Sequence, residues 1–113
     1  ETAQIMFENV DVPLIRDPRL RECDYGDLTR RPFSEVDAFR RRSPAQPFPN
    51  GESYEQAAQR IRAFLDDLKR DHDGKTVLVI GHPATHFGLE RWIDGVPVET
   101  YFTSWPVKRK YRL

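Results

Sequence analysis

The chain has 113 residues, with 18 lysines and arginines balanced by 18 aspartates and glutamates, so its formal net charge is zero. Balanced charge disfavours strong nonspecific nucleic-acid binding, and a single cysteine excludes an intramolecular disulfide and a cysteine-based zinc site. The longest apolar run, residues 77–80, is far shorter than the ~20 residues that span a membrane. We therefore expect one soluble, cytoplasmic domain over residues 1–113, with no nucleic-acid or membrane partner.

The first half of the chain predicts short elements separated by turns. Residues 1–7 have the apolar spacing of a helix end, and residues 12–15 favour an extended edge segment because they include a proline. Residues 34–42 favour a helix, because a serine at its start and an aspartate three positions later form a capping-box-like pair. The prolines of residues 44–49 then predict a loop.

The second half carries the strongest pattern. Ser53 and Gln56 form a capping box, and apolar residues then recur at helical spacing until Asp73 and Gly74 end the predicted helix. Residues 76–80 are β-branched and apolar, which is typical of a strand buried in a parallel sheet.

A second helix is predicted to follow over residues 84–93, and residues 105–113 alternate like an edge strand. The order of helix, strand, helix and strand predicts an α/β fold, a layered open sheet flanked by helices.

His82 follows the predicted buried strand after one intervening residue, Gly81, at the end of the strand where open α/β sheets gather ligands. Pro83 would begin the helix, so the N–H groups of Ala84 and Thr85 would be free to point outward. A helix N-terminus favours a bound anion. We therefore predict that His82 and Ala84 bind a phosphoryl group, although His82 could instead simply fill the turn.

Three motifs follow one another in order: DPRLRECDYGD at 17–27, PNGES at 49–53 and VLVIGH at 77–82. Together they resemble the histidine phosphatase (phosphoglycerate mutase-like) superfamily, and the similarity covers nearly the whole chain. This resemblance implies a phosphoglycerate mutase-like fold and hydrolysis of a small phosphorylated substrate through a phosphohistidine, without metal or cofactor.

The resemblance also implies a role for individual residues. Glu22 matches the general acid of the family, His82 matches its second, phosphate-binding histidine, and Tyr25 matches a substrate-facing position. Glu52 and Ser53 match the family's Gly-Glu-Ser turn, which we interpret mainly as helix initiation.

The family's Arg-His-Gly motif, which carries the nucleophilic histidine on the first strand, is absent from these 113 residues. We therefore expect an N-terminally incomplete domain that lacks this strand and is inactive alone. The short stretch after Gly26 favours a phosphatase over a mutase.

Several alternatives stay open. The chain could be a noncatalytic module of the same fold that binds a phosphorylated ligand or a protein, and it could form a homodimer. Glu22 could be an ordinary solvated carboxylate beside Arg19 and Arg21. His82 and His86 have a spacing that could share a metal, but no carboxylate ligand accompanies them, so we expect no metal site. The basic tail, residues 108–112, could bind nucleic acid.

Overall fold

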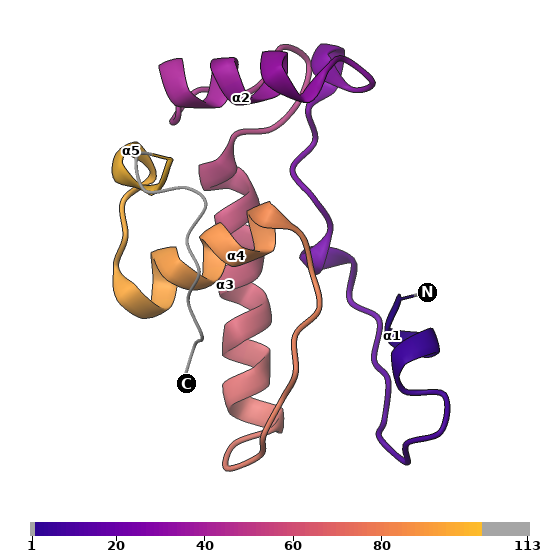
Figure 1. Cartoon of the computed structure of the whole chain (residues 1–113). Helices are drawn as coiled ribbons and strands as arrows, with labels where there is room; N and C mark the ends of the chain where they lie inside the picture. The colour runs from indigo at the N-terminus through magenta and orange to yellow at the C-terminus, as the bar shows by residue number, and fades with distance from the viewer. Residues whose placement is uncertain (1, 103–113) are drawn as a thin grey trace.

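The computed structural model describes residues 2–102, which form helices joined by turns and extended segments (Figure 1). In chain order, the helices are α1 (Thr2–Met6), α2 (Phe33–Arg42), α3 (Tyr54–Asp71), α4 (Pro83–Leu89) and α5 (Val98–Tyr101). Two 3-10 turns, η1 (Pro18–Leu20) and η2 (Gly26–Leu28), precede α2, and a π-helical turn, η3 (Glu90–Asp94), continues α4. The predicted edge strand and basic tail at residues 105–113 lie outside the described residues.

The predicted α/β fold with a layered open sheet is wrong for this structure, because residues 2–102 contain no β-strand. Residues 76–80 are neither helix nor strand, because no strand in the described part of the chain pairs with them. Leu78 is 67% exposed, and the predicted edge segment 12–15 is exposed as well. β-branched side chains favour an extended backbone, whereas a sheet also needs a second strand within hydrogen-bonding distance.

Helix α3 is the scaffold on which the other elements pack, and the predicted capping box begins it. The Ser53 amide donates to Gln56 Oε1 at 2.7 Å, and the Gln56 amide donates to Ser53 Oγ at 3.0 Å. The apolar spacing places one face of α3 in the core, as predicted; its buried residues are Tyr54, Ala57, Ala58, Ile61, Phe64 and Leu65. No helix within residues 2–102 has the length and apolar character needed to cross a bilayer.

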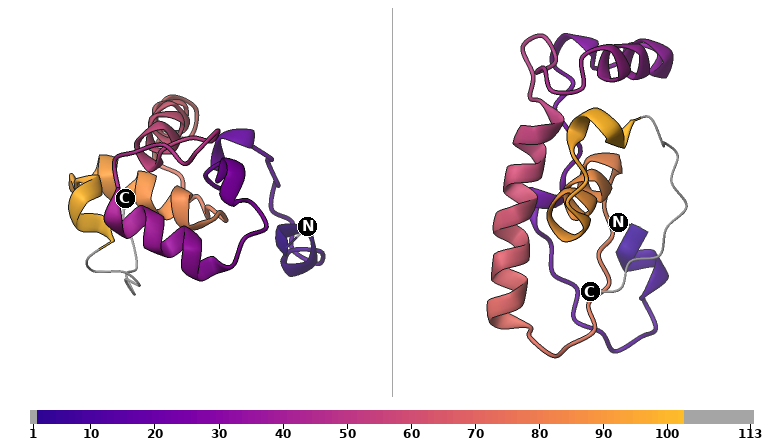
Figure 2. Two further views of the ribbon diagram at one scale, coloured as in Figure 1. Left: turned by 90° about the horizontal axis from the view of Figure 1, so that it is seen from above. Right: turned by 90° about the vertical axis from the view of Figure 1, so that its left-hand side faces the viewer.

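Helix α4 packs closely against α3 (Figure 2). Gly88 of α4 allows this close approach. A β-carbon at Gly88 would lie 2.6 Å from Cβ of Ile61, which is closer than two carbon atoms can pack. One turn later, Trp92 Nε1 donates to the Ala58 carbonyl at 2.6 Å. The segment ends at Gly95, whose φ of 71° is left-handed. The helix predicted over residues 84–93 thus ends one residue later than expected, at Asp94, and its last turn is π-helical.

Aromatic rings join α2, the loop before α3, and α5 into the same core. Phe39 of α2 lies 4.8 Å from Phe48 between ring centroids, and Tyr54 of α3 lies 4.9 Å from Phe102. Helix α1 has no buried residue and stands apart from the α3–α4 pair (Figures 1 and 2). The packed core is therefore formed by α2 to α5 together with the loops that carry Cys23 and Phe48.

The start of α2 differs from the prediction. The helix begins at Phe33, with Pro32 in the capping position and no side-chain cap. Asp37, expected to complete a capping box, instead forms ion pairs with Arg40 and Arg41 of the same helix at 2.9 and 2.8 Å. Ion pairs to two arginines hold the pKa of the Asp37 carboxyl group below its usual value, against the opposing effect of burial.

Candidate active site

The carboxyl group of Glu22 lies at the N-terminal end of α4. Its Oε1 accepts hydrogen bonds from the amide of Ala84 at 3.1 Å and from the amide of Cys23 at 2.8 Å. Both bonds end on Oε1, and Oε2 accepts no hydrogen bond from residues 2–102. The structure therefore brings a carboxyl group from residue 22 to a helix that begins 61 positions later, and one of its oxygens makes no such bond.

His82 occupies the capping position of α4, directly before Pro83 and two residues before Ala84. It is exposed, whereas Ala84 is fully buried. The sequence predicted that the Ala84 N–H would point freely outward, but in the structure it donates to Glu22. The reason is that a carboxylate satisfies an unpaired donor at the positive end of a helix. Glu22, His82 and Ala84 thus share one end of α4.

Thr85 ties this end of α4 to the loop that carries Glu22. Its hydroxyl accepts a hydrogen bond from the His82 amide at 3.1 Å and donates one to the Leu20 carbonyl at 2.9 Å. A β-carbon at Gly81 would lie 2.4 Å from this hydroxyl oxygen, so the glycine makes room for the contact. Residue 81 of the Gly-His-Pro turn must therefore be a glycine for a structural reason, independent of any role of His82.

Replacing Thr85 with valine is expected to destabilise the protein by about 1–3 kcal/mol, because it leaves the Leu20 carbonyl and the His82 amide without their partner at nearly unchanged side-chain shape. Urea unfolding measures this free energy. Thr85→Ser retains the hydroxyl and is the control. Equal stability of the valine variant and the wild type would show that the hydroxyl does not hold the loop.

The loop before Glu22 is anchored to α3 by Arg19. Its guanidinium pairs with Asp17 and with Asp67 of α3, each at 2.7 Å. The hydrogen bonds to these two carboxylates raise the pKa of Arg19. Arg21 donates to the Pro18 carbonyl. Both arginines therefore have partners other than Glu22, and Glu22 is half-buried and bonded to two amides rather than a solvated partner of theirs.

The loop after Glu22 packs against the Pro-Asn-Gly-Glu-Ser turn, backbone against backbone. The Glu52 amide donates to the Asp24 carbonyl at 3.0 Å, and the Asp27 amide donates to the Pro49 carbonyl at 2.8 Å. A β-carbon at Gly51 would lie 2.4 Å from the Asp24 carbonyl oxygen, and one at Gly26 would lie 2.1 Å from that of Pro49. The turn therefore supports the Glu22 loop as well as initiating α3, and only the second of these roles was predicted from the sequence.

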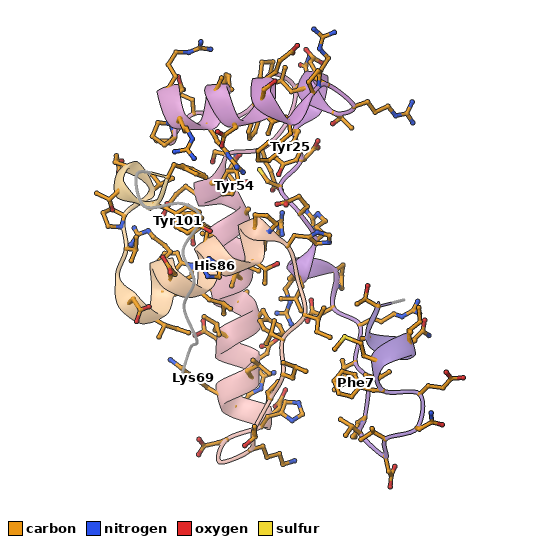
Figure 3. The ribbon with its side chains drawn as sticks, viewed as in Figure 1. Phe7, Tyr25, Tyr54, Lys69, His86 and Tyr101 are labelled. Carbon is orange, nitrogen blue, oxygen red and sulfur yellow. The ribbon has the colours of Figure 1, made fainter. Side chains whose placement is uncertain are left out.

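Tyr25 lies where the Glu22 loop meets α3, and Figure 3 shows it near Tyr54. The two phenol oxygens are 3.4 Å apart, and Arg40 donates to the Tyr54 oxygen at 3.0 Å. Burial raises the pKa of Tyr25 and raises that of Tyr54 to about 12, so both phenols are neutral at ordinary pH. Tyr25 is partly buried, and its ring packs edge-on against Phe48.

Cys23 is a packing residue in this structure. Its side chain is 4% exposed, and its thiol donates to the Glu52 carbonyl at 3.5 Å. Burial raises the pKa of the thiol, which removes the thiolate that a nucleophile would need.

Residues 2–102 contain no group of three or more metal-binding side chains. His86 contacts the Tyr101 hydroxyl through Nδ1 at 2.9 Å.

Comparison with known proteins identifies the family. The model of the histidine phosphatase superfamily (branch 1) matches residues 1–107. The chain is 30% identical over 94 residues to the uncharacterized phosphatase PhoE of Bacillus subtilis, covering 83% of this chain and 47% of that protein.

Two further relatives have different names. The chain is 33% identical over 104 residues to the probable phosphoglycerate mutase GpmB of Photorhabdus laumondii, covering 85% of this chain and 48% of that protein. It is 28% identical over 107 residues to the putative phosphoserine phosphatase 2 of Hydrogenobacter thermophilus, covering 88% of this chain and 52% of that protein. The chain thus spans about half the length of these relatives. The family match over residues 1–107 shows that this chain belongs to the histidine phosphatase superfamily.

Proposed function

We propose that the protein carrying this chain hydrolyses a small phosphomonoester through a phosphohistidine intermediate. The observation that carries the proposal is the Glu22 carboxyl group held at the start of α4, beside the position of His82. Relatives named as phosphatases and as a phosphoglycerate mutase support phosphoryl-transfer chemistry of this kind. The nucleophilic histidine is proposed to come from outside these 113 residues.

In the first step, a nitrogen of the nucleophilic imidazole forms a bond to phosphorus as the bond from phosphorus to the ester oxygen breaks. The ester oxygen leaves with the proton of Glu22, which becomes a carboxylate. In the second step, water attacks phosphorus, Glu22 takes a proton from that water, and the nitrogen–phosphorus bond breaks. The products are an alcohol and inorganic phosphate, and both side chains return to their starting states.

The local geometry supports Glu22 as the proton donor. The two backbone amides fix Oε1, while Oε2 has no hydrogen-bond partner among the described residues and can carry the proton. A general acid must be held within hydrogen-bonding reach of the oxygen that it protonates. The two amide bonds to Oε1 fix the position from which Oε2 is proposed to reach that oxygen.

His82 is proposed to hydrogen-bond an oxygen of the phosphoryl group. It is exposed at the positive end of α4, where a negative ligand is stabilised. Tyr25 is proposed to face the substrate from the loop that carries Glu22, and the amide of Ala84 is proposed to hold the Glu22 carboxyl group beside the phosphoryl group. Phosphoryl transfer depends mainly on such positioning and charge stabilisation.

Hydrolysis of p-nitrophenyl phosphate by the whole natural protein, assayed with a metal chelator, tests this proposal. We expect phosphate release in the presence of the chelator. After a rapid quench, we also expect a phosphoenzyme that is stable to base and labile to acid, as a phosphoramidate is. An enzyme that turns over without such an intermediate would contradict the mechanism. Phosphate binding without turnover would instead indicate a noncatalytic phosphate-binding member of the family.

A further inference from the structure

We infer that Arg60 is a positioning residue, which fixes the backbone of the Glu22 loop so that the carboxyl group reaches the start of α4. This role presupposes the proposed function of Glu22 as the proton donor. Arg60 lies on α3, and it matches none of the three motifs by which the sequence resembles its family. Its importance is visible only in its contacts.

The Arg60 guanidinium binds the loop through three carbonyl groups. Its Nη1 donates to the carbonyls of Arg19 and Arg21, both at 2.8 Å, and its Nη2 donates to the carbonyl of Glu22 at 3.1 Å. Three of four consecutive peptide carbonyls are thus held by one side chain. The planar guanidinium presents several donors in a fixed geometry, which suits it to this task.

Glu52 completes the arrangement by pairing with Arg60. Its Oε1 accepts hydrogen bonds from Arg60 Nη2 and, at 3.0 Å, from the amide of Asp24. The side chains of Arg60 and Glu52 are only 12% and 17% exposed, so solvent screens the pair weakly. Glu52 therefore neutralises the charge of Arg60 and also holds the loop at Asp24, two residues after Glu22.

These contacts surround Glu22 on both sides along the chain. Arg60 binds its carbonyl and those of residues 19 and 21, while Glu52 binds the amide of residue 24. The carboxyl group itself is bonded to the amides of Cys23 and Ala84. Loss of Arg60 would remove the bonds to the carbonyls of residues 19, 21 and 22 and let the backbone at Glu22 shift between its remaining anchors, Thr85 on Leu20 and Glu52 on Asp24. A displacement of about 1 Å can reduce catalysis by about a hundredfold.

The leaving group of the substrate distinguishes a positioning role from a general loss of folding. An alkoxide leaving group is a strong base and requires protonation, whereas p-nitrophenolate is a weak base and requires little. We therefore propose to measure kcat/KM for glycerol phosphate and for p-nitrophenyl phosphate with the whole natural protein. Because both substrates are assayed on one preparation, the ratio of their kcat/KM values is independent of the fraction of folded enzyme.

Arg60→Gln is expected to lower kcat/KM for glycerol phosphate at least tenfold more than for p-nitrophenyl phosphate, in the same direction as Glu22→Gln. Arg60→Lys keeps the charge opposite Glu52 and is expected to recover part of the loss. Arg62→Gln is the matched control, because Arg62 is exposed on the same helix and lies over the Trp92 ring instead. Its ratio is expected to equal that of the wild type.

The results separate the two proposals. An equal loss for both substrates in Arg60→Gln, beside an unequal loss in Glu22→Gln, would overturn the role of Arg60 alone. An unchanged ratio in Glu22→Gln, or no turnover by the wild type, would overturn the proposed function and with it the role of Arg60. Unequal losses in both variants would support the two together.

Discussion

Glu22→Gln is expected to reduce kcat/KM for an alkyl phosphomonoester by about 10²–10⁴-fold, the usual contribution of a general acid. Glutamine has the same shape and keeps an oxygen that can accept from the amides of Cys23 and Ala84. The substitution therefore removes the proton while the local hydrogen bonds persist. Steady-state phosphate release measures the effect, and the loss should be smaller with p-nitrophenyl phosphate.

Asp24→Asn is the matched control for this substitution. Asp24 lies in the same loop, is exposed, and accepts a hydrogen bond from the Gly26 amide through Oδ1 at 2.9 Å. Asparagine can keep that bond, so the control makes the same chemical change two residues away. Activity within a few-fold of wild type is expected for Asp24→Asn. Similar losses in the two variants would mean that the loop tolerates neither change and that Glu22 has no special role.

His82→Ala is expected to lower kcat/KM by about 10²–10³-fold, as removal of one donor to a transition-state oxygen does. The imidazole is exposed at the capping position of α4, so its loss should leave the core intact. Inhibition by vanadate, whose geometry resembles a phosphoryl group in transfer, should weaken in parallel. A steady-state assay with increasing vanadate measures both quantities.

His72→Ala provides the control for His82. His72 ends α3, and its amide donates to the Leu68 carbonyl, which alanine can also do. This variant is expected to match the wild type in kcat/KM and in vanadate inhibition. Unchanged vanadate inhibition in His82→Ala would contradict a role for this histidine at the phosphoryl group.

Local signals in the sequence predicted the helices well. The Ser53–Gln56 capping box and the apolar spacing after it correctly predicted α3, because a helix satisfies its backbone hydrogen bonds within its own segment. The sheet was predicted from residues 76–80 and failed, because a strand depends on a partner that a local pattern does not supply. Leu78 and Ile80 accordingly lie exposed on an extended segment.

The candidate site was predicted in part. Motif order indicated Glu22 and His82, and the structure places the Glu22 carboxyl group against Ala84, two residues after His82. The supporting residues Arg60 and Thr85 were missed. Their bonds to the Glu22 loop join residues 38 to 65 positions apart. The acceptors are backbone carbonyls, which every residue type has, so the sequence of the loop does not indicate these bonds.

Glu22 and His82 are proposed to act on one phosphoryl group at the start of α4. A crystal structure of the whole natural protein with bound vanadate tests it most directly. Vanadate oxygens are expected within hydrogen-bonding distance of a His82 ring nitrogen and of Glu22 Oε2. Vanadate bound elsewhere, with both side chains out of reach, would contradict it.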